Sequence, residues 1–234
     1  MMNKKTNRWL IPVVAAVAMV AVCWRTIVRA QSQSGGQCAV PPSGMVGWWP
    51  GDGDANDIIN GNNGALNDAT FGPGEVGEAF NFDGTDDGVR VPASASLNVT
   101  SFTIDAWVFP TDLGRRPIVE YSPDSGHAGI HLWQSVTDVV PCTGSGAGSL
   151  YANLRDTSGG QHVICSASPV LTVSQWNHVA VTYDQPSGVA QLFANGAMVA
   201  QSTLGSYTPQ TSTPLYFGER PPAASKEELP ITPV

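Results

Sequence analysis

Apolar and polar residues alternate along much of the second half of this 234-residue chain. In the run from Phe102 to Pro110, every second residue is apolar and faces one side, as in a half-buried β-strand. The run Trp176–Asp184 alternates in the same way, and a polar turn separates it from a further alternating run, Val189–Ala194. Asn195-Gly196 follows at once, and both residues tolerate the positive φ angles of a type I′ turn. The pattern therefore predicts successive antiparallel hairpins.

Shorter runs of the same kind occur elsewhere, and no segment shows a sustained helical period. We expect further strands at residues 45–50, 79–84, 88–92, 117–122, 129–134, 149–155, 162–167 and 215–218. Many short strands separated by Gly- and Pro-containing turns are typical of a sandwich or jelly roll. The predicted fold class is all-β, an antiparallel β-sandwich jelly roll.

Five sequence blocks carry a family resemblance, in this order: Gly47–Gly53, Asn63-Gly64, Gly77–Gly84, Phe102–Val108 and Trp176–Gly196. Together they resemble the laminin-G-like jelly rolls of the concanavalin A-like lectin and glucanase superfamily. The resemblance implies a concanavalin A-like sandwich, and it favours binding over catalysis. After Tyr216-Phe-Gly218 the family continues to a strand with a Gly, Ile, Asp-Glu-Val pattern, which this sequence does not show. We therefore expect the sandwich to lack its closing C-terminal strand, which would expose Trp48 or Trp49.

The N-terminus has the features of an export signal. Lys4, Lys5 and Arg8 precede an apolar run from Trp9 to Trp24, and Ala30 offers a small residue at the cleavage edge. We predict a signal peptide at 1–30, a linker at 31–44, the jelly-roll domain at 45–219 and a Pro-rich tail at 220–234. An uncleaved signal anchor is the alternative, and either outcome makes the domain secreted or extracellular.

The net charge of the chain limits the classes of partner that we expect. Removal of residues 1–30 leaves 6 basic and 19 acidic residues, a net charge of −13 with neutral histidines. Such a chain repels phosphate backbones, so nucleic acid is not an expected partner. We also expect no membrane partner after signal cleavage.

Three cysteines remain after that cleavage. Cys142 and Cys165 flank an expected strand, and an oxidising compartment permits a disulfide between them. Cys38 is then left over. The sequence holds no CxxC pair of the kind that binds zinc.

Oxygen ligands recur in the acidic loop after the first block, at Asp52, Asp54, Asn56 and Asp57. Their spacing is like the first half of an EF-hand, but Asp57 stands at position six in place of Gly and Asn63 at position twelve in place of Glu. An EF-hand is excluded. A looser calcium site and a simple solvated turn both stay open, and Ca²⁺ is the one cofactor we expect.

The sequence argues against an enzyme. Glycosidases on this scaffold use a Glu-x-Asp-x-x-Glu strand, and none of the six glutamates has an Asp two residues later. No Gly-x-Ser-x-Gly motif of the hydrolase kind follows a buried strand and opens a helix. We therefore expect no catalytic residues.

A binding face is the remaining candidate site. Aromatic rings stack on the apolar faces of sugars, while Asn and Arg bond to hydroxyls. Six such residues lie on the non-core side of their strands by alternation: Trp107, His131, Trp133, Tyr151, Asn153 and Arg155. The alternative is that some of these side chains belong to the core.

The sequence thus predicts a secreted, non-catalytic recognition module for a glycan or an extracellular protein, assisted by calcium if the acidic loop binds it. Two alternatives stay open. One is a structural or adhesion domain whose open edge near Met45–Pro50 is completed by another chain. The other is an accessory fragment of a glycosidase.

Overall fold

The computed structural model describes residues 41–123 and 128–221. The chain divides into two units, residues 1–43 and 44–234, and the β-strands belong to the second. The predicted signal peptide, most of the linker and residues 222–234 lie outside the described residues, as do Cys23 and Cys38. Within the described ranges, no helix is long and apolar enough to span a membrane.

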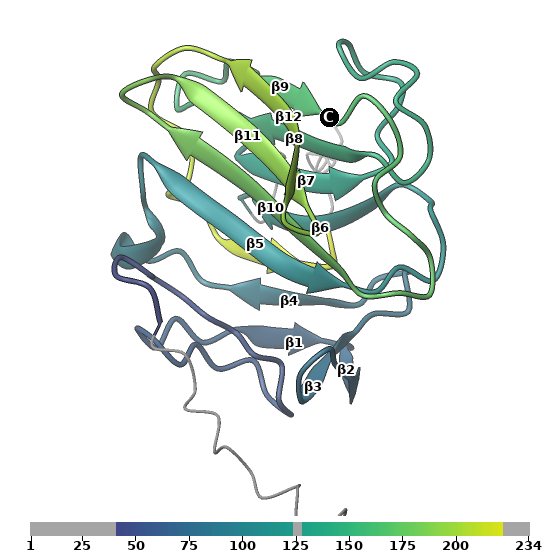
Figure 1. Cartoon of the computed structure of the whole chain (residues 1–234). Helices are drawn as coiled ribbons and strands as arrows, with labels where there is room; N and C mark the ends of the chain where they lie inside the picture. The colour runs from purple at the N-terminus through teal and green to yellow at the C-terminus, as the bar shows by residue number, and fades with distance from the viewer. Residues whose placement is uncertain (1–40, 124–127, 222–234) are drawn as a thin grey trace, which may run out of the picture. The chain divides into compact units, whose positions relative to one another are not determined.

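The larger of two main sheets has seven strands in the order β1-β4-β13-β6-β7-β8-β9 (Figure 1). Each pair of neighbours is antiparallel. The strands are β1 (Ala65–Asn67), β4 (Gly88–Val91), β13 (Leu215–Phe217), β6 (Arg116–Tyr121), β7 (Ile130–Gln134), β8 (Leu150–Leu154) and β9 (Val163–Cys165).

The smaller sheet has four strands in the order β12-β11-β10-β5 (Figure 1). They are β12 (Ala197–Thr203), β11 (Val189–Ala194), β10 (Asn177–Asp184) and β5 (Phe102–Val108). Asn195 and Gly196 join β11 to β12 with φ angles of 50° and 78°, which confirms the predicted hairpin. A separate hairpin pairs β2 (Thr70–Pro73) with β3 (Glu78–Asn81), and a short 3₁₀ helix covers Ala95–Leu97.

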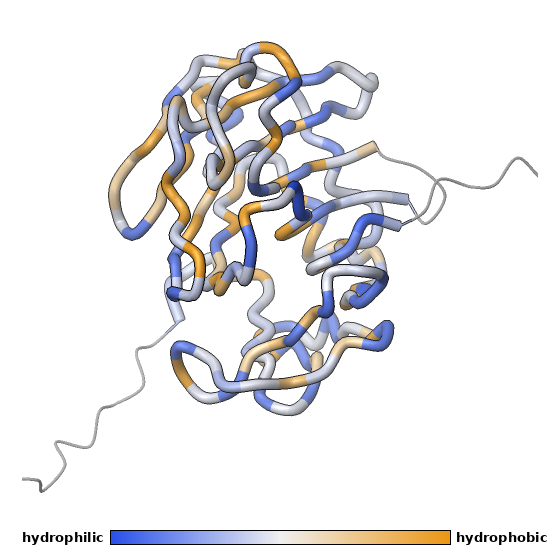
Figure 2. Tube along the Cα trace, turned by 90° about the vertical axis from the view of Figure 1, so that its right-hand side faces the viewer, coloured by the Kyte–Doolittle hydropathy of each residue, from blue (hydrophilic) through white to orange (hydrophobic). Residues whose placement is uncertain are grey.

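The core lies between the two main sheets. The small sheet contributes Val179, Val181 and Tyr183 from β10, and the large sheet contributes alternate residues of β7 and β8. Figure 2 shows hydrophobic and hydrophilic positions interspersed along the described chain. Burial of these apolar faces is the main favourable term in folding, and the predicted antiparallel sandwich is confirmed.

The structure corrects the strand predicted at residues 45–50, which is irregular. Its backbone is held by a loop instead of a sheet: Trp48 N donates to Asp57 Oδ1 at 2.9 Å, and Ile58 N donates to the Trp48 carbonyl at 3.0 Å. The Trp48 side chain is 43% exposed, whereas Trp49 packs edge-on against Phe217 with ring centroids 5.1 Å apart. The open edge predicted at Met45–Pro50 is therefore wrong for that segment.

The last described strand, β13, is central in the large sheet, between β4 and β6. The family-like closing strand would follow it in sequence, where the described residues end at Pro221. The absence of that strand stays a prediction.

Candidate functional site

The six residues predicted to form one binding face do not lie together. Trp107 is on β5 of the small sheet, whereas the other five lie on or just after β7 and β8 of the large sheet. Within the large sheet the alternation holds, since His131 pairs with Asn153 and Trp133 pairs with Tyr151. A single face that includes Trp107 is therefore wrong, because alternation fixes which side of a sheet a residue faces but not the sheet to which its strand belongs.

Four of the five large-sheet members of this set are covered, and the fifth, Arg155, is half-buried. The exposed fractions of His131, Trp133, Tyr151 and Asn153 are 5%, 9%, 7% and 3%. Val136, Val139 and the disulfide pack against Trp133 and Tyr151 in a second small apolar cluster. The Arg220 guanidinium lies over the Trp133 ring, 4.2 Å from its centroid. These side chains thus serve packing in the described structure and do not offer a sugar platform.

A buried carboxylate organises this covered face. Glu120 on β6 is fully buried, and Arg220 Nε donates to its two oxygens at 2.9 and 3.0 Å. Trp133 Nε1 donates to the same carboxylate at 3.0 Å. Burial raises the pKa of Glu120 above its ordinary value, although the charge and hydrogen bonds of Arg220 and the hydrogen bond of Trp133 act in the opposite direction.

Arg220 reaches this position because the chain turns sharply after β13, at Gly218 with φ 76°. The predicted domain map assigns Arg220 to the Pro-rich tail 220–234, but the structure makes it part of the domain. The alternation of residues in this strand could have identified Glu120 as a charged residue on one face of the sheet. Its partner Arg220 is 100 positions away in the sequence, so no local pattern connects the two. Arg220 and Trp133 thus hold the Glu120 carboxylate in the interior of the domain.

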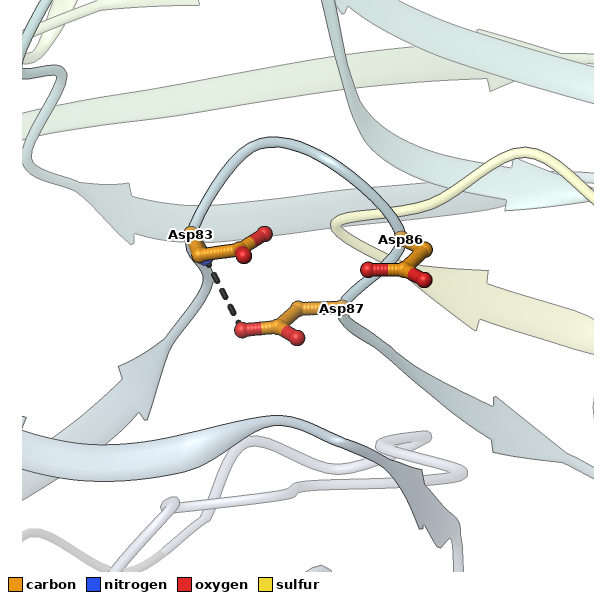
Figure 3. Close-up of side chains that lie close together, drawn as sticks. All are labelled: Asp83, Asp86 and Asp87. Carbon is orange, nitrogen blue, oxygen red and sulfur yellow. Dashed lines mark hydrogen bonds between the residues drawn. The ribbon is translucent and has the colours of Figure 1, made fainter.

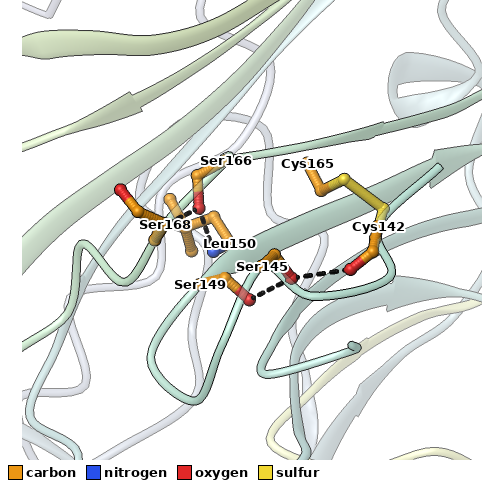
Figure 4. The surroundings of a disulfide bond; sticks show 7 residues. All are labelled: Cys142, Ser145, Ser149, Leu150, Cys165, Ser166 and Ser168. Carbon is orange, nitrogen blue, oxygen red and sulfur yellow. Dashed lines mark hydrogen bonds between the residues drawn. A yellow bond between two sulfur atoms is a disulfide. The ribbon is translucent and has the colours of Figure 1, made fainter. Parts of the chain in front are cut away.

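The predicted disulfide is present and joins Cys142 to Cys165, with Cα atoms 5.8 Å apart (Figure 4). It ties the loop before β8 to β9. Ser145 Oγ donates to the Cys142 carbonyl at 2.9 Å, so the loop is also fastened by hydrogen bonds.

Replacing both Cys142 and Cys165 with alanine is expected to lower the free energy of unfolding by about 3 kcal/mol, because the bridge closes a loop across 23 positions. Urea denaturation of the two proteins measures the difference. As a control, a reducing agent should lower the melting temperature of the wild type and leave that of the double variant unchanged. Equal stability of reduced and oxidised wild type would contradict the prediction.

The acidic loop uses its predicted calcium ligands for its own hydrogen bonds. Asp57 is 5% exposed and accepts from several backbone amides, while Asp52 Oδ1 accepts from Glu78 N at 2.8 Å. Asp54 accepts from the side-chain amide of Asn56 at 2.6 Å. These contacts account for the carboxylates of the loop without a metal, and calcium binding by this loop stays a prediction.

Among the described residues, the one group of three carboxylates that lies close enough to share a metal ion is not in this loop but at Asp83, Asp86 and Asp87 (Figure 3). Asp87 Oδ2 accepts from Asp83 N at 2.9 Å, and Asp83 Oδ1 accepts from Thr85 N at 2.7 Å. Carboxylate donors of this kind suit Ca²⁺, but short loops use aspartates in the same way to bind their own amides. We assign no cation to this loop.

Exposed aromatic side chains gather instead on the outer face of the small sheet. Trp107 is 51% exposed and Phe109 is 44% exposed. Trp107 meets His178 edge-on at 5.2 Å, and Phe109 meets Trp176 edge-on at 5.4 Å between ring centroids. We call these four residues the aromatic shelf.

The shelf has a polar border. His178 lies opposite Trp107 in the ladder, and its Nε2 is 3.2 Å from Asp105 Oδ1. Trp107 lies on β5 and Phe109 follows the strand by one residue, two positions further on and on the same side by alternation, so their Cα atoms are about 7 Å apart. Flat apolar rings beside hydrogen-bonding groups can hold a ligand that has both apolar and polar faces, such as a sugar.

The paired antiparallel sheets with a core between them define a β-sandwich jelly roll. The family model described as the concanavalin A-like lectin/glucanases superfamily, of the laminin G type, matches residues 83–229, more than half of the chain. The chain belongs to this family. Among curated proteins, no relative matches it.

Several solved structures share the fold. The binding domain of Paraclostridial Mosquitocidal Protein 1 is 16% identical with a TM-score of 0.54, over 70% of this chain and 41% of that one. The Botulinum neurotoxin serotype G binding domain is 14% identical with a TM-score of 0.52, over 71% and 41%. Domain 4 of AbnA, a GH43 extracellular arabinanase from Geobacillus stearothermophilus in complex with arabinotriose, is 17% identical with a TM-score of 0.50, over 72% and 81%. This chain thus spans less than half of either toxin chain, and at such identities the likeness concerns the fold alone.

Proposed function

We propose that this chain is an exported, non-catalytic module that binds carbohydrate through the aromatic shelf. The observation that carries the proposal is the exposure of Trp107 on β5 and of Phe109 just after it, beside the polar pair His178 and Asp105. Large exposed aromatic residues gathered on one face commonly mark an interaction site.

The similar structures give this proposal support of a general kind. Two are described as binding domains, and domain 4 of the arabinanase was solved with an oligosaccharide. The disulfide fits export to an oxidising compartment. The proposal includes calcium only in the form predicted from the sequence, as an ion bound by Asp52, Asp54, Asn56 and Asp57.

The test is a panel of oligosaccharides, arabinotriose among them, applied to the purified protein with and without Ca²⁺. Trp107→Ala should weaken binding of any sugar that the wild type binds by roughly tenfold, because the lost ring no longer buries apolar area against the sugar and a loss of about 1.4 kcal/mol is tenfold. Replacing Phe109 as well should remove most of the remaining signal. Isothermal titration measures both effects.

Trp48→Ala is the matched control, since Trp48 is also exposed but belongs to the irregular segment that precedes the acidic loop. It should bind like the wild type. Equal binding by the wild type and Trp107→Ala would overturn the assignment of the site. Binding of an extracellular protein with no response to any sugar would overturn the ligand class.

A further inference from the structure

The outer face of the small sheet carries more than the aromatic shelf. Val179 and Val181 of β10 belong to the core, so the residue between them points outward, together with its ladder partners on β11 and β12. Phe193 is the outward partner of Ala180, and Met198 is the partner of Phe193. Met198 is 53% exposed and Phe193 is half-buried. We call Phe193 and Met198 the apolar pair.

A row of polar side chains crosses the same face beside the apolar pair. It takes one outward residue from each strand of the sheet: Thr103, Thr182, Gln191 and Gln201. Gln191 Nε2 donates to Gln201 Oε1 at 2.7 Å and to the Met198 sulfur at 3.3 Å, so these three side chains lie together on one face. Hydroxyl and amide groups both donate and accept hydrogen bonds, as the hydroxyls of a sugar do. We call these four residues the polar row.

The aromatic shelf, the apolar pair and the polar row extend over all four strands of the small sheet (Figure 1). Trp107 lies on β5 at one edge of this sheet, and Met198 lies on β12 at the other. Three strand spacings separate the two residues, which is about 14 Å at the usual distance between neighbouring strands. One sugar ring is too small to contact both residues, whereas several linked rings can reach from one to the other.

The strands of this face carry no lysine or arginine. The basic residues that the structure describes all lie on strands of the large sheet or within three residues of one: Arg90, Arg115, Arg116, Arg155 and Arg220. A carboxylate or sulfate group on a sugar would therefore find no lysine or arginine partner on the small sheet, and the acidic chain would repel it. The distribution of charge thus favours an uncharged ligand.

We propose that the small sheet binds several linked units of a linear, neutral polysaccharide across its strands, from the aromatic shelf to the apolar pair, which rests on the carbohydrate binding proposed above. One sugar ring stacks on Trp107, and a later ring of the same chain lies on Phe193 and Met198. The polar row bonds to the hydroxyls between them. The ligand is therefore defined by its length and its lack of charge as well as by its class.

Isothermal titration of the full-length protein with oligosaccharides of graded length tests this site. The probes are linear neutral oligosaccharides of arabinose, xylose, glucose and mannose, each from two to six units long. For a sugar that the wild type binds, the affinity should rise about tenfold once the chain is long enough to bury apolar area on Met198. An anionic oligogalacturonate of six units should bind roughly tenfold more weakly than the neutral chain of equal length.

Met198→Ala should weaken binding of the six-unit oligosaccharide about tenfold and leave binding of the two-unit one unchanged, because a short chain held at Trp107 does not reach Met198. Ile58→Ala is the matched control, since Ile58 is 56% exposed but precedes β1 of the large sheet. It should bind like the wild type at both lengths. Both variants should melt like the wild type, because substitutions of exposed side chains cost little stability.

The outcomes distinguish this site from the proposed function. Binding that depends on Trp107 but neither on chain length nor on Met198 would overturn the extended site and leave the proposed function intact, whereas no binding of any sugar would overturn both. Tighter binding of the oligogalacturonate than of the neutral chain would also overturn the extended site. So would self-association of the wild type that Met198→Ala abolishes in sedimentation, because a second copy would then cover this face.

Discussion

Replacing Arg220 with alanine is expected to lower the free energy of unfolding by about 3 kcal/mol. The variant leaves the fully buried Glu120 with the Trp133 Nε1 donor and the His131 ring, 3.5 Å away, and a buried charge that loses its charged partner costs several kcal/mol. The expected value lies at the low end of that range, because the Arg220 side chain is 33% exposed and solvent already screens part of the interaction. Urea denaturation at pH 7 measures the loss.

The pH dependence of this loss gives a second check. Burial already raises the pKa of Glu120, and removal of the Arg220 charge would raise it further. A carboxyl whose pKa is higher in the folded state stabilises the fold when protonated, and that contribution is lost as the pH rises through the folded pKa. The stability difference between wild type and Arg220→Ala should therefore be smaller at pH 4 than at pH 7.

Two other variants test the specificity of the effect. Arg116 forms an exposed ion pair with Asp112 at 3.2 Å, so Arg116→Ala should cost less than about 1 kcal/mol. Arg220→Lys keeps the charge but loses the planar group that lies over Trp133, and its stability should lie between wild type and alanine. If Arg116→Ala and Arg220→Ala were equally destabilising, the buried pair would have no special role.

The sequence predicted the strands best where one face is buried. The alternation of β5 and β10 follows directly from the opposition of core and solvent, and Asn195-Gly196 predicts the turn between β11 and β12. The prediction was wrong at residues 45–50, because the Trp48 amide bonds to the Asp57 side chain instead of a neighbouring strand. No local pattern shows that a distant side chain replaces a strand partner.

At the candidate site, too, the features that depend on local sequence were predicted and those that depend on the tertiary fold were not. Cysteine spacing and compartment predicted the Cys142–Cys165 bridge, which the structure contains. Alternation also put His131, Trp133, Tyr151 and Asn153 on one side of the large sheet. This side of the sheet is buried because Arg220 and the disulfide loop cover it. The tertiary fold places those segments, and the periodicity of the strands does not predict them.

Asp57→Ala is expected to destabilise the chain by about 3 kcal/mol through the loop that precedes β1. The Asp57 carboxylate accepts from the backbone amides of Trp48, Ile59 and Asn62 at 2.9, 3.0 and 3.0 Å, and from the Asn62 side chain at 2.8 Å. Hydrogen bonds to a charged group contribute about 1.5–3 kcal/mol each, but water can replace part of them in an opened loop. Thermal and urea denaturation measure the loss.

Acid should weaken the contribution of Asp57 to stability. Burial alone would raise the pKa of Asp57, but its backbone and side-chain donors outweigh burial and hold the pKa below the ordinary value. A carboxyl with a lowered folded pKa contributes stability above its unfolded pKa, and that stability is lost as the pH falls through the folded pKa. The difference between wild type and Asp57→Ala should therefore be full at pH 7 and should shrink below pH 4.

The same experiment separates a loop held by its own amides from a calcium site. Asp54 is exposed and bonds only locally to Asn56, so Asp54→Ala should leave stability within about 0.5 kcal/mol of wild type. If the amides that donate to Asp57 hold the loop by themselves, a chelator should leave the melting temperature of the wild type unchanged. If the chelator lowered that temperature and Asp54→Ala abolished the response, the loop would bind calcium, as its run of alternating oxygen ligands first predicted.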